Sequence, residues 1–122
     1  MHRVSFAAVM CLVILPVLAQ DPVQLDPKHY KVEFVNAKVR VLHINLGPRE
    51  STPMHSEPPS VLVWLTDGTL KCSAAGGKTE EVHGMAKHAA WVPAIQRACE
   101  NLGDQPVEFY QISLKSGPPF PE

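Results

Sequence analysis

The sequence predicts an all-β fold, in which about eight short strands form a closed barrel or a sandwich of two sheets. Over residues 30–35 and 38–46, apolar and polar residues alternate with a period near two, and many of them are β-branched. Turn residues interrupt these runs about every ten residues. The chain after residue 29 has no stretch of ten residues with helical periodicity that is free of glycine and proline. A barrel or sandwich protects the sheet edges that such strands would otherwise expose.

The first residues of the chain predict export. His2 and Arg3 precede an apolar stretch over residues 4–19, and Ala19 places a small residue where signal peptidase cuts. We predict cleavage after Ala19, which makes the mature chain secreted or periplasmic. An uncleaved anchor helix is one alternative, for which the stretch is short. A lipoprotein signal is a weaker one, because Cys11 lies in the middle of the apolar run.

Cleavage there would leave 103 of the 122 residues, enough for one domain. The net charge of −1 and the lack of basic runs argue against nucleic acid or an anionic membrane as a partner, so we expect small molecules or proteins. Cys72 and Cys99 remain, and export would let a disulfide persist; whether they pair depends on the fold. The predicted organisation is a signal peptide (1–19), an extended arm (20–29), a β-barrel domain (30–115) and a C-terminal tail (116–122).

The first half of the predicted barrel contains a hairpin, a loop and a buried strand. Strands over 30–35 and 38–46 flank Asn36-Ala37, which predicts a tight turn. Residues 47–53 are rich in proline and charged or polar residues, which indicates a loop. The nearly all-apolar run over 60–65 predicts the next strand.

The second half is predicted as a series of short strands joined by turns. Asp67-Gly68 predicts a hairpin between strands 60–65 and 69–73, and Gly76-Gly77 predicts another that leads into strand 78–83. Three further strands follow, separated by Pro93 and by a turn over residues 103–106, and they cover 89–93, 95–101 and 107–114.

Two segments carry a family resemblance. The segment from Gly47 to Glu57, followed by a strand that ends at Asp67-Gly68, resembles the first cupin motif. The segment over residues 91–104 resembles the second. The resemblance implies a small jelly-roll (cupin) β-barrel, with imidazole nitrogens and a carboxylate that project inward to form an open site for one divalent transition metal.

Only part of the metal-binding set implied by this resemblance is present. His55 stands at the first histidine position, but Glu57 occupies the second, and Val61 or Leu62 falls where a glutamate is expected. Arg97 replaces the histidine of the second motif, and its guanidinium is always charged and has no lone pair to offer. We expect a Glu57–Arg97 ion pair to replace the metal. An anionic ligand on Arg97, or a rebuilt metal site of His55, Glu57 and another histidine, remains an alternative.

Two more polar side chains are candidates because of the strand face they share. His43 lies on the face of Val39 and Val41, and we consider it as a metal ligand that points into the barrel. Gln111 lies among apolar neighbours on the face of Phe109. If it faces the cavity, we expect its amide to contact a ligand.

Three classes of function fit these residues. A metal-dependent enzyme of oxygenase or isomerase type needs three ligands for Fe, Mn, Ni or Zn and an open position. A metal-free binding module needs a cavity with polar groups, which His55, Glu57, Arg97 and Gln111 supply. A metal-free enzyme could use His55 as a general base. We favour a small-molecule-binding or structural module without a cofactor, with a metal-dependent enzyme using His55 and Glu57 as the runner-up. By analogy with cupins, the strand over 30–35 could also form a homodimer.

Overall fold

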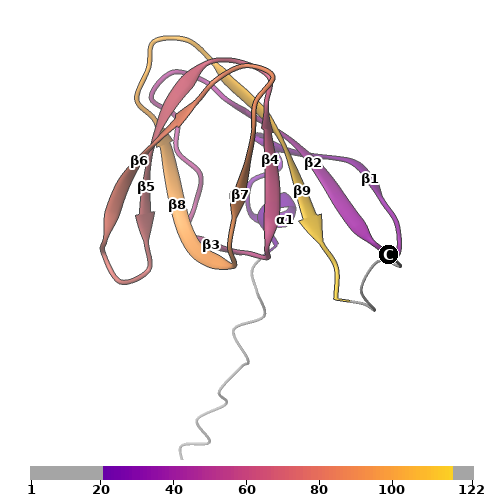
Figure 1. The fold of residues 1–122 in the computed structure, drawn as a ribbon. Helices are drawn as coiled ribbons and strands as arrows, with labels where there is room; N and C mark the ends of the chain where they lie inside the picture. Colours follow the sequence, from indigo (N-terminus) through magenta and orange to yellow (C-terminus); the bar gives the residue numbers. More distant parts are fainter. Residues whose placement is uncertain (1–20, 117–122) are drawn as a thin grey trace, which may run out of the picture.

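The computed structural model describes residues 21–116, so the expected signal segment and residues 117–122 lie outside the described part. In this part, nine strands form two antiparallel sheets that face each other (Figure 1). The predicted all-β class and small jelly-roll barrel are therefore confirmed. No helix within residues 21–116 is long and apolar enough to cross a membrane.

Most successive strands lie in opposite sheets, and only the pairs β1–β2 and β5–β6 stay within one sheet. A five-stranded sheet has the order β1-β2-β9-β4-β7, and a four-stranded sheet has the order β3-β8-β5-β6. The elements are α1 (Pro22–Leu25), β1 (Tyr30–Val35), β2 (Val39–Leu46), β3 (His55–Glu57), β4 (Ser60–Trp64), β5 (Gly68–Ala74), β6 (Thr79–Gly84), β7 (Ala89–Val92), β8 (Ile95–Asn101) and β9 (Val107–Leu114).

Two of the three predicted hairpins are confirmed. The Asn36 side chain accepts hydrogen bonds from two backbone N–H groups in the turn between β1 and β2. Gly77 has a φ of 89°, which suits glycine, in the turn between β5 and β6. The prediction of a hairpin at Asp67-Gly68 is wrong, because β4 and β5 belong to different sheets. There the Asp67 carboxylate accepts a hydrogen bond from the backbone of Ala86, which ties this crossing to the segment after β6.

The sequence analysis did not predict two short elements, α1 and β3. The arm is not simply extended, since α1 forms where Asp21 caps the helix by accepting a hydrogen bond from Val23, with Pro22 at the first helical position. Strand β3 follows the predicted loop and pairs with β8. Neither element is long enough to display a hydrophobic period, so its residues alone do not reveal it.

The core lies between the two sheets and is built from alternate residues of each strand. Its largest ring contact joins Trp64 and Phe109, whose centroids lie 5.1 Å apart. Gly84 allows the other sheet to approach this ring closely. The other core residues are Tyr30, Leu42, Ile44, Leu46, Leu62, Leu70, Cys72, Val92, Cys99 and Val107.

Asn101 fastens the loops at the end of β8. Its side chain is fully buried, and its amide nitrogen donates to the carbonyl groups of Leu46, Gly47 and Gln105. Its side-chain oxygen accepts a hydrogen bond from the backbone of Gly103. The amide therefore replaces backbone pairing where the segment after β2 meets the loop between β8 and β9.

The two cysteines of the described chain form a disulfide across the four-stranded sheet. Cys72 of β5 lies directly opposite Cys99 of β8, with the two Cα atoms 4.1 Å apart. The backbone N–H and carbonyl of Cys99 both bond to Thr52 on the other side. Opposite residues that exchange no backbone hydrogen bonds bring their side chains closest together. The pairing that the sequence left open thus follows from strand register.

We expect reduction of this disulfide to lower the free energy of unfolding by about 3 kcal/mol, because the bond closes a loop with a sequence separation of 27. Urea unfolding with and without dithiothreitol measures the change. The Cys72→Ala/Cys99→Ala variant should resemble the reduced protein and should not respond to dithiothreitol. An unchanged midpoint in wild-type protein with two titratable free thiols would contradict this expectation.

We expect Gly84→Ala to destabilise the fold by about 1–3 kcal/mol through overpacking. A Cβ at this position would lie 2.0 Å from a ring carbon of Trp64, so the ring or the strand must move. Gly76→Ala is the matched control, since a Cβ there meets no atom within 4 Å. Urea midpoints that are equal in the two variants would show that the barrel tolerates the added methyl group.

Candidate functional site

Four polar side chains meet inside the barrel where β3 pairs with β8. His55 lies directly opposite Arg97, and Glu57 follows two residues later on the same face of β3. Tyr30 reaches them from the start of β1. All four are buried, with exposed fractions of 4% for Tyr30, 3% for His55, 8% for Glu57 and 6% for Arg97. We call these four residues the buried polar cluster.

The Glu57 carboxylate is the centre of the buried polar cluster. Its Oε2 accepts a hydrogen bond from Nε of Arg97 at 3.2 Å, and its Oε1 lies 3.2 Å from Nε2 of His55. The predicted Glu57–Arg97 ion pair is therefore confirmed. A buried carboxylate is tolerated only when it is paired and hydrogen-bonded, and here each oxygen has a cationic or imidazole partner.

The orientation of His55 is fixed on both sides of its ring. Its Nδ1 donates to the carbonyl of Pro53 at 2.8 Å, which leaves Nε2 facing Glu57 and the Tyr30 hydroxyl, 3.3 Å away. Burial lowers the pKa of His55, but the hydrogen bonds to Glu57 and Pro53 outweigh it, so the pKa is raised. The Glu57 carboxylate thus stabilises the protonated form of His55.

Tyr30 closes the buried polar cluster toward β1. Its ring meets the His55 ring edge-on, with centroids 5.4 Å apart. Burial first, and then the negative charge of Glu57, raises the pKa of the Tyr30 hydroxyl. The hydroxyl therefore stays protonated, and no second negative charge forms beside Glu57.

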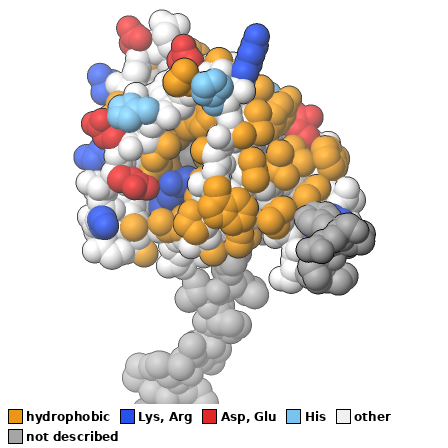
Figure 2. Space-filling model, in the orientation of Figure 1, with side chains coloured by type: hydrophobic (Ala, Val, Ile, Leu, Met, Phe, Trp, Pro, Cys, Tyr) orange, Lys and Arg blue, Asp and Glu red, His pale blue; other side chains and the backbone are white. Residues whose placement is uncertain are grey.

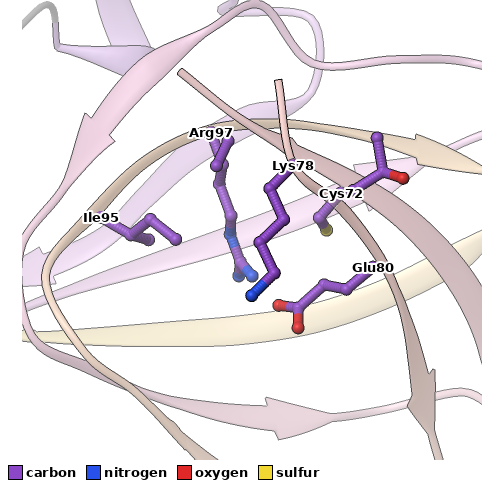
Figure 3. Close-up of a pocket in the computed structure, with 7 residues that line it drawn as sticks. Cys72, Lys78, Glu80, Ile95 and Arg97 are labelled. Carbon is purple, nitrogen blue, oxygen red and sulfur yellow. The ribbon is translucent and has the colours of Figure 1, made fainter. Parts of the chain in front are cut away.

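A pocket of about 160 Å³ lies beside Arg97 (Figure 3). Its lining comes from β5, from β8 and from the start of β6. Since Glu57 engages Nε, the two terminal nitrogens of Arg97 remain, and Figure 3 shows that end of the side chain pointing into the pocket. The head groups of Lys78 and Glu80 point into the same space. The lining residues are Cys72, Ala74, Lys78, Thr79, Glu80, Ile95 and Arg97.

Of the four residues predicted to bind a ligand, only Arg97 lines this pocket. His55 and Glu57 lie in the buried polar cluster and hold Arg97 from the other side. Gln111 is buried on the face of Phe109, as expected, but its amide nitrogen donates to the Ser60 hydroxyl at 3.2 Å. The Gln111 amide nitrogen therefore links β9 to β4 and does not line this pocket.

The expectation that His43 points into the barrel is wrong. Leu42 and Ile44 fill the core, so His43 lies on the outer face of β2. There its ring nitrogens lie 3.3 Å from a Glu33 oxygen and 3.2 Å from a Glu108 oxygen. The apolar character of this outer face misled the prediction, and Figure 2 shows apolar side chains gathered on the five-stranded side, with charged ones around β5 and β6.

Sequence reasoning missed the residues that β6 contributes to the pocket. Lys78, Thr79 and Glu80 follow the glycine turn, where charged residues usually indicate a solvated strand end. The alternation of side chains along the strand could have identified Glu80. It places Glu80 on the same face as Val82, which packs against the core. A polar residue on the inner face of a barrel strand is a candidate for contact with a ligand.

The buried polar cluster does not fit the metal ion that the cupin resemblance implies. Both oxygens of Glu57 and Nδ1 of His55 are already engaged, and the Arg97 guanidinium lies where a further donor would be needed. Within residues 21–116, no group of three or more His, Cys, Asp or Glu side chains is arranged to hold a metal ion. We therefore assign no step to a metal.

No protein-family model and no curated protein matches the chain. Solved structures do match. A cupin domain from Bordetella pertussis Tohama I has a TM-score of 0.67 and 21% identity, over 71% of this chain and 92% of that one. An RmlC-like cupin family protein with a double-stranded β-helix fold, from Methanocaldococcus jannaschii, has a TM-score of 0.57 and 19% identity, over 73% and 83%.

A Cupin 2 conserved barrel domain protein from Salinispora arenicola has a TM-score of 0.54 and 17% identity, over 72% of this chain and 76% of that one. At these identities the comparisons bear on the fold. They agree with the strand order of the two sheets and with the cupin resemblance of the two sequence segments. The chain therefore has the cupin fold, a double-stranded β-helix.

Proposed function

We propose that this chain is an exported, metal-free binding protein of cupin fold, which holds a small molecule by a carboxylate or phosphate group at Arg97. The observation that carries the proposal is the position of this arginine. It is buried, it lines a pocket, and its terminal nitrogens point into that pocket while Nε is held by Glu57.

This arrangement suits anion recognition for a geometric reason. A guanidinium presents two parallel N–H groups to a carboxylate or phosphate, and binding is stronger when the side chain is already ordered. Glu57 supplies that order from inside the barrel. The side chains of Ala74 and Ile95 offer apolar surface to the rest of the ligand. The pocket volume of about 160 Å³ suits a small metabolite.

The disulfide supports the export part of the proposal. Disulfides persist in oxidising compartments, and the Cys72–Cys99 bond lies within the barrel itself. The apolar N-terminal stretch and Ala19 point the same way. We therefore place the mature protein outside the cytoplasm, in the periplasm or the extracellular space.

The proposal is tested by metal analysis and calorimetry on mature protein purified without a histidine tag. We expect Fe, Mn, Ni and Zn well below one equivalent, and binding of propionate or inorganic phosphate to wild-type protein. The Glu57→Gln/Arg97→Gln variant should weaken that binding at least tenfold, because it removes the guanidinium together with the buried carboxylate that pairs with it. Comparing the two probes identifies which anionic group the pocket prefers.

Two results would overturn the proposal. One is a stoichiometric metal that is lost in His55→Ala, which would favour the metal-dependent enzyme. The other is the absence of any binding of either probe at millimolar concentration. Lys71→Gln is the matched charge control, since this exposed residue of β5 alternates with the inward-facing Leu70 and Cys72.

The raised pKa of His55 predicts how stability depends on pH. The folded state holds a proton that the unfolded state releases near pH 6.5, so stability is fully present below that pH and is lost as pH rises through the raised pKa. The slope for one proton is at most about 1.4 kcal/mol per pH unit. Urea unfolding between pH 6 and 9 measures it, with Glu57, Arg97 and Tyr30 as the neighbouring charged or titratable groups.

The His55→Gln variant should remove this part of the pH dependence, whereas His83→Gln should keep it, because His83 is exposed on the outer face of β6. The comparison uses slopes rather than absolute stabilities, so a weaker fold in His55→Gln does not affect it. Equal slopes in wild-type protein and His55→Gln would show that His55 does not gain a proton on folding.

A further inference from the structure

The pocket beside Arg97 is lined by charges of both signs. Arg97 carries a positive charge that Glu57 offsets from inside the barrel. Lys78 and Glu80 add one charge of each sign, and within residues 21–116 their side chains form no hydrogen bond or ion pair with each other or with another group. Figure 3 shows their head groups directed toward the guanidinium end of Arg97.

This balance matters for the kind of ligand that the pocket accepts. A simple anion would gain from Arg97 and Lys78, but it would also face the Glu80 carboxylate. A simple cation would be attracted by Glu80 but repelled by Arg97 and Lys78. A molecule that carries both charges can place each one against an opposite charge, and it adds no net charge to a site that already holds charges of both signs.

We propose that the ligand of this pocket is a small zwitterion with a carboxylate and an ammonium group, of the size of a small amino acid. The inference rests on the proposed function and specifies its ligand class. The carboxylate binds the terminal nitrogens of Arg97 and the Lys78 ammonium. The ligand ammonium binds the Glu80 carboxylate.

The pocket also sets a limit on the remainder of the ligand. Cys72, Ala74 and Ile95 provide the uncharged part of the lining, and the volume is about 160 Å³. These side chains suit a short apolar substituent rather than a third charged group. The competing interpretation is that Lys78 and Glu80 neutralise each other, which would leave Arg97 as a site for any small anion.

Three matched probes separate these interpretations by calorimetry on the mature protein. Alanine carries both charged groups, propionate lacks the ammonium group, and ethylamine lacks the carboxylate. We expect alanine to bind at least tenfold more tightly than either of the others. Glu80→Gln should reduce alanine binding to the level of propionate and leave propionate binding equal or stronger.

Glu81→Gln is the matched control, because Glu81, like Glu80, is an exposed residue of β6, but it lies near His83 and outside the pocket lining. It should keep the preference for alanine. Equal binding of alanine and propionate to wild-type protein would overturn the zwitterion inference while the proposed function stands. An equal effect of Glu80→Gln and Glu81→Gln would also overturn it. If none of the three probes binds, the zwitterion inference fails, and the proposed function fails with it only if inorganic phosphate does not bind either.

Discussion

The buried carboxylate of Glu57 constrains the arrangement of β3 and β8. A carboxylate that is removed from water is stable only when hydrogen-bond donors or positive charges contact its oxygens. One oxygen faces the His55 imidazole and the other accepts the Arg97 Nε–H. These contacts require β3 and β8 to pair in the observed register. They also explain why the pKa of His55 is raised and why Arg97 presents only its terminal nitrogens to the pocket. The buried polar cluster therefore binds Nε of the Arg97 guanidinium, and the pocket is lined by the same guanidinium.

Strand β8 is held firmly on both sides of the arginine that it carries. On one side the ion pair with Glu57 joins it to β3, and on the other the disulfide from Cys99 joins it to β5. At its end, the Asn101 side chain donates to three carbonyl groups, two at the end of β2 and one in the loop between β8 and β9. A side chain on a strand fixed in these ways loses little further freedom when a ligand arrives, which favours affinity in a small pocket.

Much of the fold was predictable, because period-two alternation and turn residues fixed the bounds of β8 and β9 and the hairpin at Asn36. The Glu57–Arg97 pair was predictable from motif positions. Strand faces were harder: β2 has apolar residues on both faces, so alternation could not tell the side of His43 from the core side. Crossings between sheets, such as the one after β4, depend on long-range packing that Asp67-Gly68 does not reveal. The position of Glu80 beside Arg97 also depends on long-range strand pairing, since β5 lies between β6 and β8.

Replacing a metal centre by a guanidinium changes what a cupin barrel can do. A metal ion with an open position can polarise or activate a bound molecule, whereas a guanidinium offers fixed N–H donors and a permanent charge. His55 does not supply the missing reactivity, since Pro53 and Glu57 occupy its ring nitrogens and it does not line the pocket. A general base must come within hydrogen-bond reach of the bound molecule. The arrangement therefore supports the proposal of selective binding, in which Arg97 would orient a ligand that the charges of Lys78 and Glu80 select.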